Sequence, residues 1–297
     1  MKILVTGANG YVGSRVCRLG GGKHEITALV RPSSNISLLI DSKLHSLVRA
    51  DASNWKSIIQ ETRPHSVILC DWNGVRGSAR EFDDQEINSQ RQLELLEVAA
   101  QSGVKNLVNL GSQAEVGQVE GEIQEAFQGN PLTRYGIAKK NLSQNFLEFS
   151  GGDIRVVWAR VFSLYGTPQG DEWFIPRLVS ALANNQDFEM TMGEQLWNYL
   201  HVDDCARAIL QLVENDSETG IVNVAHPESI TLRNIADIIS RNIPTSGRIK
   251  FGSLPYRPSE PMSLLPAIHK LKRLGWKPKI ELERGIQEFI HWKTTER

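Results

Sequence analysis

The sequence TGANGYVG, residues 6–13, comes directly after the apolar run ILV at residues 3–5. Its glycines, Gly7, Gly10 and Gly13, are spaced three residues apart. After a buried strand, the first glycine permits a tight turn, the second lets the backbone approach a pyrophosphate, and the third allows close packing of a helix. The N-terminus of that helix then faces the phosphates. The stretch therefore predicts a strand, a turn and a helix that together bind a dinucleotide.

Short apolar runs alternate with longer helix-like stretches along the chain. The clearest helix-like stretches are residues 84–101 and 134–149. The runs that we interpret as buried strands are residues 2–5, 24–30, 66–70, 106–110, 154–159, 199–202 and 221–224. Such alternation is typical of a parallel sheet with helices on both faces. We therefore predict an α/β fold with a Rossmann-type, doubly wound parallel sheet.

The alternation becomes less regular from about residue 166, where prolines become frequent. This change predicts a dinucleotide-binding domain over residues 1–166 and a smaller C-terminal domain, mainly residues 167–297, that binds the substrate. Residues 199–225 again contain strand-like and helix-like patterns. We expect this segment to return to the first domain and its sheet.

Composition excludes several classes of partner. Lys and Arg number 33 against 34 Asp and Glu, so no overall field attracts the chain to nucleic acid or to an anionic membrane. No apolar stretch approaches the roughly 20 residues that cross a bilayer. Three unpaired cysteines and a strand-like start after Met1 favour a reducing, cytoplasmic location. Cys and His show no metal-ligand spacing, so we expect no metal.

A second motif suggests acid–base chemistry. Tyr135 and Lys139 stand four residues apart, which places them on one face of a helix, and Ser112 ends an earlier apolar run. A phenol normally titrates near about 10, and a neighbouring ammonium lowers that pKa toward a range useful for proton transfer. A serine hydroxyl can stabilise the negative charge that develops on a substrate oxygen during hydride transfer. These three residues together therefore suit acid–base catalysis.

The glycine spacing, the later Ser112 and the Tyr135-Gly-Ile-Ala-Lys139 motif together resemble the short-chain dehydrogenase/reductase superfamily. Four further stretches resemble its extended branch, which contains nucleotide-sugar epimerases, dehydratases and ketoreductases. These are NSQRQLELLEVAA at 88–100, RVFSLYG at 160–166, HVDDCARAI at 201–209 and LGWKP at 274–278. The resemblance covers nearly the whole chain. It implies an NAD(P)-dependent enzyme that acts on a nucleotide sugar, and we predict Ser112, Tyr135 and Lys139 as its catalytic residues.

The residues after the second predicted strand bear on the choice of cofactor. A carboxylate there would bind the ribose hydroxyls of NAD, whereas a cation accommodates the extra phosphate of NADP. The strand ends instead in Val30 and Arg31, followed by Ser33 and Ser34. Arginine pairs well with phosphate. We predict that Arg31, Ser33 and Ser34 contact this phosphate and that NADP(H) is preferred, with NAD(H) possible.

The resemblance implies further cofactor contacts. Cys70, among these, is better interpreted as a small packing residue than as a nucleophile. Besides Gly7, Gly10, Gly13, Tyr135 and Lys139, the implied contacts are Asn9, Tyr11, Val12, Asp51, Ala52, Leu69, Cys70, Asp71 and Val161.

The residues after Ser112 limit which of the family's reactions we expect from this chain. In the family, 4,6-dehydratases follow the catalytic hydroxyl with an acid, and 3,5-epimerase/reductases place a cysteine two positions after it. This chain has Gln113 and Ala114, and Glu115 is one position too late for a dehydratase. The absence of these residues, together with the predicted preference for NADP(H), which suits net reduction, favours an NADPH-dependent reduction of the 4-keto group of a nucleotide-linked 4-keto-6-deoxyhexose, with Tyr135 as general acid. The alternatives are an NAD-dependent nucleotide-sugar 4-epimerase and a non-catalytic NADP(H)-binding redox sensor.

Substrate contacts are expected mainly from the smaller domain. Trp197 stands where relatives often have an arginine, and it either stacks on the nucleotide base or fills the interface between domains. The substrate-binding residues that the resemblance implies are Ser112, Ser163, Phe174, Ile175, Arg177, Trp197 and Arg257. The two long helices at 84–101 and 134–149 form a four-helix contact in relatives. We therefore also predict a homodimer.

Overall fold

The described part of the computed structural model, residues 1–149, 153–257 and 261–295, is built around a seven-stranded parallel sheet. The strand order is β12-β7-β5-β4-β1-β2-β3. The strands are β1 (Lys2–Thr6), β2 (Glu25–Val30), β3 (Ser46–Arg49), β4 (Ser66–Leu69), β5 (Asn106–Ser112), β7 (Arg155–Val161) and β12 (Gly220–Val224). Each neighbouring pair is parallel, for example Ile3 opposite Ile26 and Ser66. The strand order changes direction between β1 and β4, where an open α/β sheet binds its ligand.

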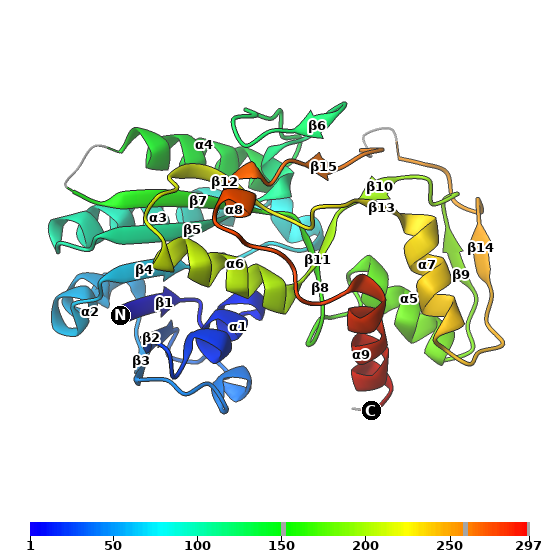
Figure 1. The fold of residues 1–297 in the computed structure, drawn as a ribbon, viewed down its shortest axis with the longest axis horizontal. Coiled ribbons are helices and arrows are strands. Elements are labelled where there is room, and N and C mark those ends of the chain that lie inside the picture. Colours follow the sequence, from blue (N-terminus) through cyan, green and yellow to red (C-terminus); the bar gives the residue numbers. More distant parts are fainter. Residues whose placement is uncertain (150–152, 258–260, 296–297) are drawn as a thin grey trace.

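Helices cover both faces of this sheet, as Figure 1 shows. On one face lie α1 (Tyr11–Gly20) and α6 (Val202–Glu214), and on the other lie α2 (Trp55–Thr62), α3 (Asp84–Gln101) and α4 (Arg134–Glu148). The sheet is therefore doubly wound, as predicted.

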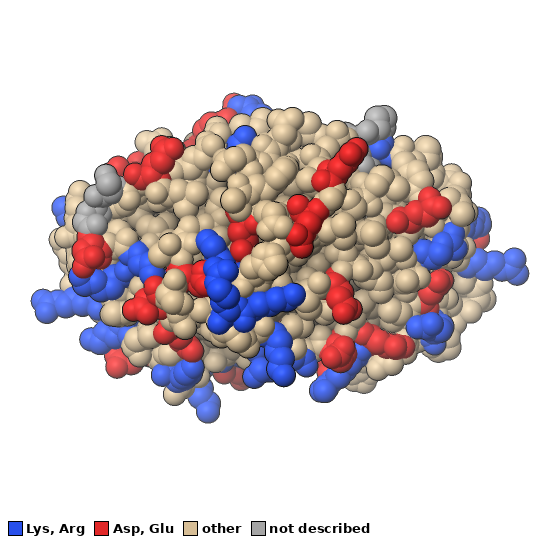
Figure 2. All heavy atoms as spheres, turned by 45° about the horizontal axis from the view of Figure 1, so that its top comes forward, with Lys and Arg blue, Asp and Glu red and all other residues tan. Residues whose placement is uncertain are grey.

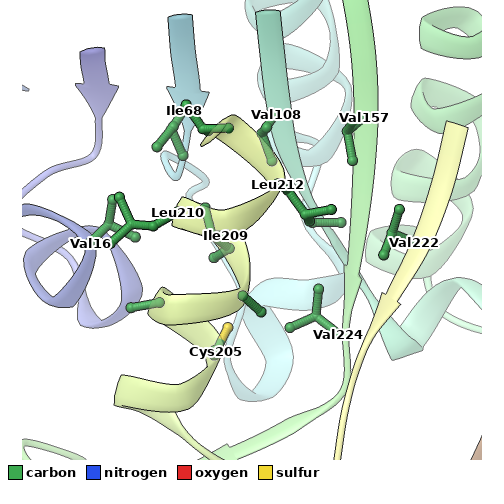
Figure 3. Close-up of a cluster of buried hydrophobic side chains, with 14 of the residues drawn as sticks. Val16, Ile68, Val108, Val157, Cys205, Ile209, Leu210, Leu212, Val222 and Val224 are labelled. Atoms are coloured by element: carbon green, nitrogen blue, oxygen red, sulfur yellow. The ribbon is translucent and has the colours of Figure 1, made fainter. Parts of the chain in front are cut away.

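Two apolar clusters hold these layers together. Figure 3 shows the first, in which Ile209 and Leu212 of α6 pack under Ile68 and Val108 of the sheet. The second lies on the opposite face and contains Trp158, which is fully buried. Both faces of the central strands are thus buried, which explains why these strands are continuous apolar runs in the sequence.

The C-terminal part of the chain adds a smaller group of elements, on the right of Figure 1. A third apolar cluster joins its helices α5 (Phe174–Ala183), α7 (Leu232–Arg241) and α9 (Leu282–Thr295). Short strands pair beside them: β8 (Ser163–Tyr165) with β11 (Tyr199–His201), β9 (Phe188–Met190) with β14 (Ile249–Phe251), and β10 (Leu196–Trp197) with β13 (Ile230–Thr231). In addition, β6 (Glu122–Ile123) pairs with β15 (Leu265–Pro266), which precedes α8 (His269–Arg273).

The observed strands differ from the predicted ones at β3 and β11, and the other short paired strands outside the central sheet were not predicted either. β3 was not predicted, because it has only four residues, SLVR, whose side chains alternate between partial burial and exposure at the sheet edge. β11 was expected to return to the central sheet, but it pairs with β8 in a separate two-stranded sheet. β12, from the same returning segment, does join the central sheet beside β7.

The surface is mixed in charge. Positive and negative side chains are interspersed over the face that Figure 2 shows. No helix in the described part of the chain has both the length and the apolar composition to span a membrane.

Substituting Gly13 by alanine tests the close packing of α1 against the turn. In an ordinary helix this change stabilises by about 1 kcal/mol. Here the new Cβ would overlap the carbonyl oxygen of Gly7, so we expect a loss of about 1–3 kcal/mol instead. Urea denaturation measures the difference, with Asn145→Ala at an exposed position of α4 as the control. A stabilised Gly13→Ala protein would contradict the packing described here.

Candidate active site

The turn between β1 and α1 leaves room for backbone alone. Gly7 has a φ of +57°, and a Cβ there would lie 2.7 Å from the amide nitrogen of Asp71. The N–H of Gly10 donates to the carbonyl oxygen of Gly7 at 2.9 Å. Gly10 is also the N-cap residue of α1, and it has no side chain to cover the first N–H groups of the helix. This glycine-lined helix N-terminus fits a dinucleotide pyrophosphate.

The other predicted residues of the turn contact protein. The Asn9 amide donates to the carbonyl oxygen of Asn35 at 3.2 Å. The Tyr11 hydroxyl donates to the carbonyl oxygen of Gly166 at 3.0 Å, and Val12 packs against the first apolar cluster. Tyr11 thus connects α1 to the residue that follows β8.

The loop after β2 has a cationic character. Arg31 is exposed, with Nη1 3.5 Å from Asn73 Oδ1, and Ser33 is exposed beside it. The Ser34 hydroxyl is buried and has no hydrogen-bond partner among the residues that the structure describes. Arg49, at the end of β3, donates from Nη1 to the carbonyl oxygens of Pro32 and Ser34, at 2.8 and 3.0 Å. The exposed guanidinium of Arg31 and that of Arg49, which is bonded to the same loop, therefore fit a phosphate monoester.

Sequence reasoning missed Arg49, which contacts the loop that holds Arg31. Its signal was only a cation at the end of an unpredicted strand. Asp51, which was predicted to contact the adenine, lies exposed directly after β3. Ala52 belongs to a 3-10 helix, Ala52–Asn54, and its side chain lies outside the described part of the structure.

The end of β4 adjoins the glycine turn. Leu69 is buried, and burial raises the pKa of the Cys70 thiol well above its ordinary value, which suits a packing role. Asp71 accepts a hydrogen bond from Thr6 Oγ1 at 2.5 Å and lies 3.7 Å from Arg91 Nε. Val161, half-buried, ends β7 on the other side of β5. No group of three His, Cys, Asp or Glu side chains that could hold a metal ion occurs in the described ranges.

The predicted catalytic residues come from two adjacent elements. Ser112 is the last residue of β5, and Tyr135 and Lys139 lie in the first turns of α4. Thr133 caps α4 by accepting a hydrogen bond from the Gly136 N–H at 3.1 Å. Tyr135 is 8% exposed and Lys139 is 3% exposed. The four-residue spacing and the cap thus bring both buried side chains to the end of β5. Tyr135 forms a side-chain hydrogen bond with Ser112, and Lys139 contacts Leu110.

The electrostatics of Tyr135 differ from the expectation. Burial raises the pKa of its phenol, whereas a side-chain hydrogen bond with Ser112 and the positive charge of Arg80 act in the opposite direction. Lys139 is not among the groups that lower this pKa, and the lowering expected from its ammonium stays a prediction. Lys139 Nζ donates to the carbonyl oxygen of Leu110 at 2.7 Å.

Lys139 is enclosed by aromatic side chains. Its Nζ lies 3.6 Å from the ring centroid of Trp72, a cation–π contact, and 5.5 Å from that of Trp158. Burial lowers the pKa of Lys139 to about 7, against the negative charges of Glu115 and Asp71, which raise it. Near neutral pH this amine therefore changes charge easily.

Trp72 is a second residue that sequence reasoning missed. Besides covering Lys139, it meets the ring of Tyr135 edge-on, with centroids 5.9 Å apart. Its indole N–H donates to Gln85 Oε1 at 2.8 Å. The one available signal was a large aromatic residue directly after Leu69, Cys70 and Asp71, which were predicted to line the cofactor.

Glu115 has a structural task beneath Ser112. Its Oε1 accepts the Ser112 N–H at 2.5 Å, and the Trp158 indole donates to both carboxylate oxygens at 3.0 Å. Arg160 Nε lies 3.3 Å from Oε2, and both charged side chains are buried. Burial raises the pKa of Glu115, and the positive charge of Arg160 opposes this rise. Glu115 therefore fixes the backbone that carries Ser112.

Two predicted substrate residues form a chain with Gln113. The Trp197 indole donates to Ser163 Oγ at 2.8 Å, and Ser163 Oγ donates to Gln113 Oε1 at 3.0 Å. Trp197 also packs against the first apolar cluster. Of the two roles considered for Trp197, this arrangement matches filling the interface between the large and small parts of the chain.

The remaining predicted substrate residues belong to the smaller part. Ile175 is 1% exposed and packs in the third apolar cluster. Phe174 meets the ring of Phe188 edge-on, with centroids 6.1 Å apart, and Arg177 lies over the same ring. Arg257 is exposed at the last described position before residue 258. Ile175 thus serves the core through its side chain, whereas Arg177 and Arg257 are accessible.

Comparison with known proteins agrees with this geometry. The chain is 23% identical to the CDP-abequose synthase of Salmonella muenchen, over 98% of each protein. It is 24% identical to the dTDP-6-deoxy-L-talose 4-dehydrogenase (NAD(+)) of Aggregatibacter actinomycetemcomitans, over 89% of this chain and 98% of that protein. The UDP-N-acetylglucosamine 4-epimerase structure from Methanobrevibacter ruminantium M1, in complex with UDP-N-acetylmuramic acid, superposes with a TM-score of 0.89. It is 22% identical and covers 100% of this chain and 99% of that one, which confirms the fold.

The family comparison covers most of the chain. A family model described as NAD dependent epimerase/dehydratase matches residues 3–225, which include the glycine turn, Ser112, Tyr135 and Lys139. The predicted resemblance is confirmed: this chain belongs to the NAD dependent epimerase/dehydratase family of nucleotide-sugar-modifying enzymes.

Proposed function

We propose that the protein reduces the 4-keto group of a nucleotide-linked 4-keto-6-deoxyhexose with NADPH. The observation that carries this proposal is the loop after β2, where Arg31 is exposed and Arg49 donates to the carbonyl oxygens of Pro32 and Ser34. A phosphate on the adenine ribose suits this loop, whereas NAD would lack a carboxylate partner at the strand end. An exchangeable NADPH in turn suits net reduction.

Three residues supply the chemistry that the protein itself contributes. NADPH, when bound, provides the hydride that adds to the carbonyl carbon. Tyr135 gives its hydroxyl proton to the carbonyl oxygen as the C=O π bond opens, and solvent later returns a proton to the phenolate. The Ser112 hydroxyl, beside Tyr135, stabilises the oxygen as it gains negative charge. Lys139, whose ammonium bonds the carbonyl oxygen of Leu110 on β5, would hold the ribose next to the nicotinamide when the cofactor is bound.

The residues around Ser112 favour reduction over dehydration. The side chain of Gln113, directly after Ser112, is neutral, and its oxygen accepts a hydrogen bond from Ser163 at 3.0 Å. The nearest acid along the chain, Glu115, is buried under Ser112 and paired with Arg160. A proton acceptor for a sugar carbon would have to be accessible to the substrate. The similarity to CDP-abequose synthase and to a 4-dehydrogenase further supports oxidation–reduction at the sugar.

A nucleotide-sugar 4-epimerase is the second candidate, favoured by the fold similarity to a UDP-N-acetylglucosamine 4-epimerase. Such an enzyme keeps its NAD bound through each turnover. The two candidates are distinguished by the cofactor that is extracted from the purified protein and by NADPH oxidation, followed by absorbance, with nucleotide 4-keto-6-deoxysugars. Stoichiometric, tightly held NAD would contradict the reductase, and no oxidation with any substrate would favour a redox sensor.

Tyr135→Phe removes the proton donor while leaving the phosphate-binding elements in place. We expect kcat to fall by about 100-fold or more, with NADPH affinity retained, because general acid catalysis typically contributes that much. Steady-state kinetics and fluorescence titration with NADPH measure the two quantities. Tyr199→Phe on β11, a half-buried tyrosine in the smaller part of the chain, is the control. Full activity of Tyr135→Phe would refute its role as general acid.

Arg31→Ala tests the cofactor preference. Loss of this guanidinium should weaken NADPH binding by about 10-fold or more and NADH binding little, because only NADPH carries the extra phosphate. Dissociation constants for both cofactors give the answer. Arg18→Ala, an exposed arginine near the far end of α1, makes the same change of charge away from the turn. Equal losses for both cofactors would show that Arg31 does not contact the phosphate.

We also propose a homodimer formed by α3 and α4. These helices pack together and expose large apolar side chains, including Ile87, 60% exposed, and Ile137, 43% exposed. Sedimentation at micromolar concentration should give a dimer, and the double variant Ile87→Glu/Ile137→Glu should give monomers, because burying two carboxylates is costly. Ile40→Glu, at a position 78% exposed outside these helices, should remain dimeric. A monomeric wild-type protein would contradict the proposal.

A further inference from the structure

The segment of residues 72–81, between β4 and α3, lies beside Tyr135 and Lys139. It begins with Trp72 and ends with the 3-10 helix Gly77–Glu81. Two fully buried side chains of α3 hold it in place. Gln85 Nε2 donates to the carbonyl oxygens of Gly74 and Ala79 at 3.0 and 2.9 Å. Asn88 bonds both the N–H and the carbonyl oxygen of Asn73, at 3.2 and 2.9 Å.

This segment places an arginine against the phenol ring of Tyr135. The Arg80 guanidinium carbon Cζ lies 4.8 Å from the ring centroid of Tyr135. Arg80 Nε is buried and has no hydrogen-bond partner in the described part of the chain. Among the same residues, no carboxylate forms an ion pair with Arg80, whereas Arg76 of the same segment pairs with Glu172. The charge of Arg80 is therefore not neutralised by a neighbouring acid.

The other charged groups around Tyr135 are already engaged. On its own helix, Lys139 bonds Leu110, and Arg134 pairs with Asp83 and Glu86. From the elements packed against α4, Glu81 accepts the Arg134 N–H, and Glu115 is paired with Arg160. Beyond Trp72, Asp71 is held by Thr6 and Arg91. Arg80 is thus the cation best placed to act on the phenol.

We propose that Arg80 is a positioning residue for Tyr135, whose guanidinium, lying over the ring, stabilises the negatively charged form of this phenol. The buried setting strengthens the effect, because little water lies between the two groups to screen their attraction. Arginine suits this task since it remains charged at every pH at which the protein is folded. The consequence for turnover rests on the proposed reduction, but the effect on the phenol itself does not.

The experiment follows the ionisation of Tyr135 directly. The five tyrosines are replaced by a ring-fluorinated tyrosine, which is more acidic, and ¹⁹F NMR is recorded against pH. The Tyr135 signal is the one that Tyr135→Phe removes. In Arg80→Gln its titration midpoint should rise by about one pH unit, because an opposite charge at this distance shifts a pKa by that much or more. Arg80→Lys should keep most of the wild-type midpoint.

Two controls make the result specific. Arg76→Gln removes an arginine of the same segment that is paired with Glu172, and it should leave the midpoint unchanged. Arg80→Met provides a second neutral side chain should Arg80→Gln fail to fold, as judged by circular dichroism. An unchanged midpoint in a folded neutral variant would overturn the proposal.

Activity provides a separate readout. Reduction needs the protonated phenol, so kcat/KM should fall as the pH rises through the pKa of Tyr135. Without Arg80 this pKa is higher, and the fall should move to higher pH by the same amount. If no keto sugar is reduced, the proposed function fails while the fluorine titration still decides the role of Arg80.

Discussion

The backbone of Gly7 and the backbone at the end of β4 lie so close that any side chain at Gly7 would overlap the amide nitrogen of Asp71. Thr6 strengthens this junction by donating to the Asp71 carboxylate and accepting from the Cys70 N–H. Because β4 lies between β1 and β5, the junction also fixes the distance from the glycine turn to Ser112. Parallel strands end at one edge of the sheet, so the glycine turn and Tyr135, the proposed proton donor, become neighbours there. The geometry of the site therefore depends on the close contact between the backbone of Gly7 and the backbone of Asp71.

Much of this arrangement could be predicted because its signals are local. Buried parallel strands are continuous apolar runs, and a helix such as α3 begins and ends where its sequence pattern does, at Asp84 and Gln101. The glycine turn and the Tyr135/Lys139 spacing are also contained within a few residues. β3 and β11 show the limit of this reasoning. A four-residue edge strand has no buried alternation, and the choice of partner for β11 depends on β8, which lies more than 30 residues away.

The electrostatics of the site could not be predicted, because they arise between residues far apart in the sequence. Trp72 and Arg80 reach Tyr135 only because buried Gln85 and Asn88 fold their segment against α3. Glu115 was judged by its offset from Ser112, whereas its role depends on Arg160. An arginine within the apolar strand Arg155–Val161 was a usable signal, since a buried cation requires a carboxylate partner.

Burial shifts the pKa values of the two titratable groups of the site in opposite directions, and in both groups it favours the uncharged form. It raises the pKa of Tyr135 and lowers the pKa of Lys139 to about 7, since desolvation penalises the charged form of each. A phenol in this state keeps its proton at neutral pH and can give it to an oxygen, which is the direction that the proposed reduction uses. The charge that then appears on Tyr135 meets groups already in position, Ser112 and Arg80. Such stabilisation acts only as charge develops, and therefore lowers the barrier without tightening the binding of the substrate.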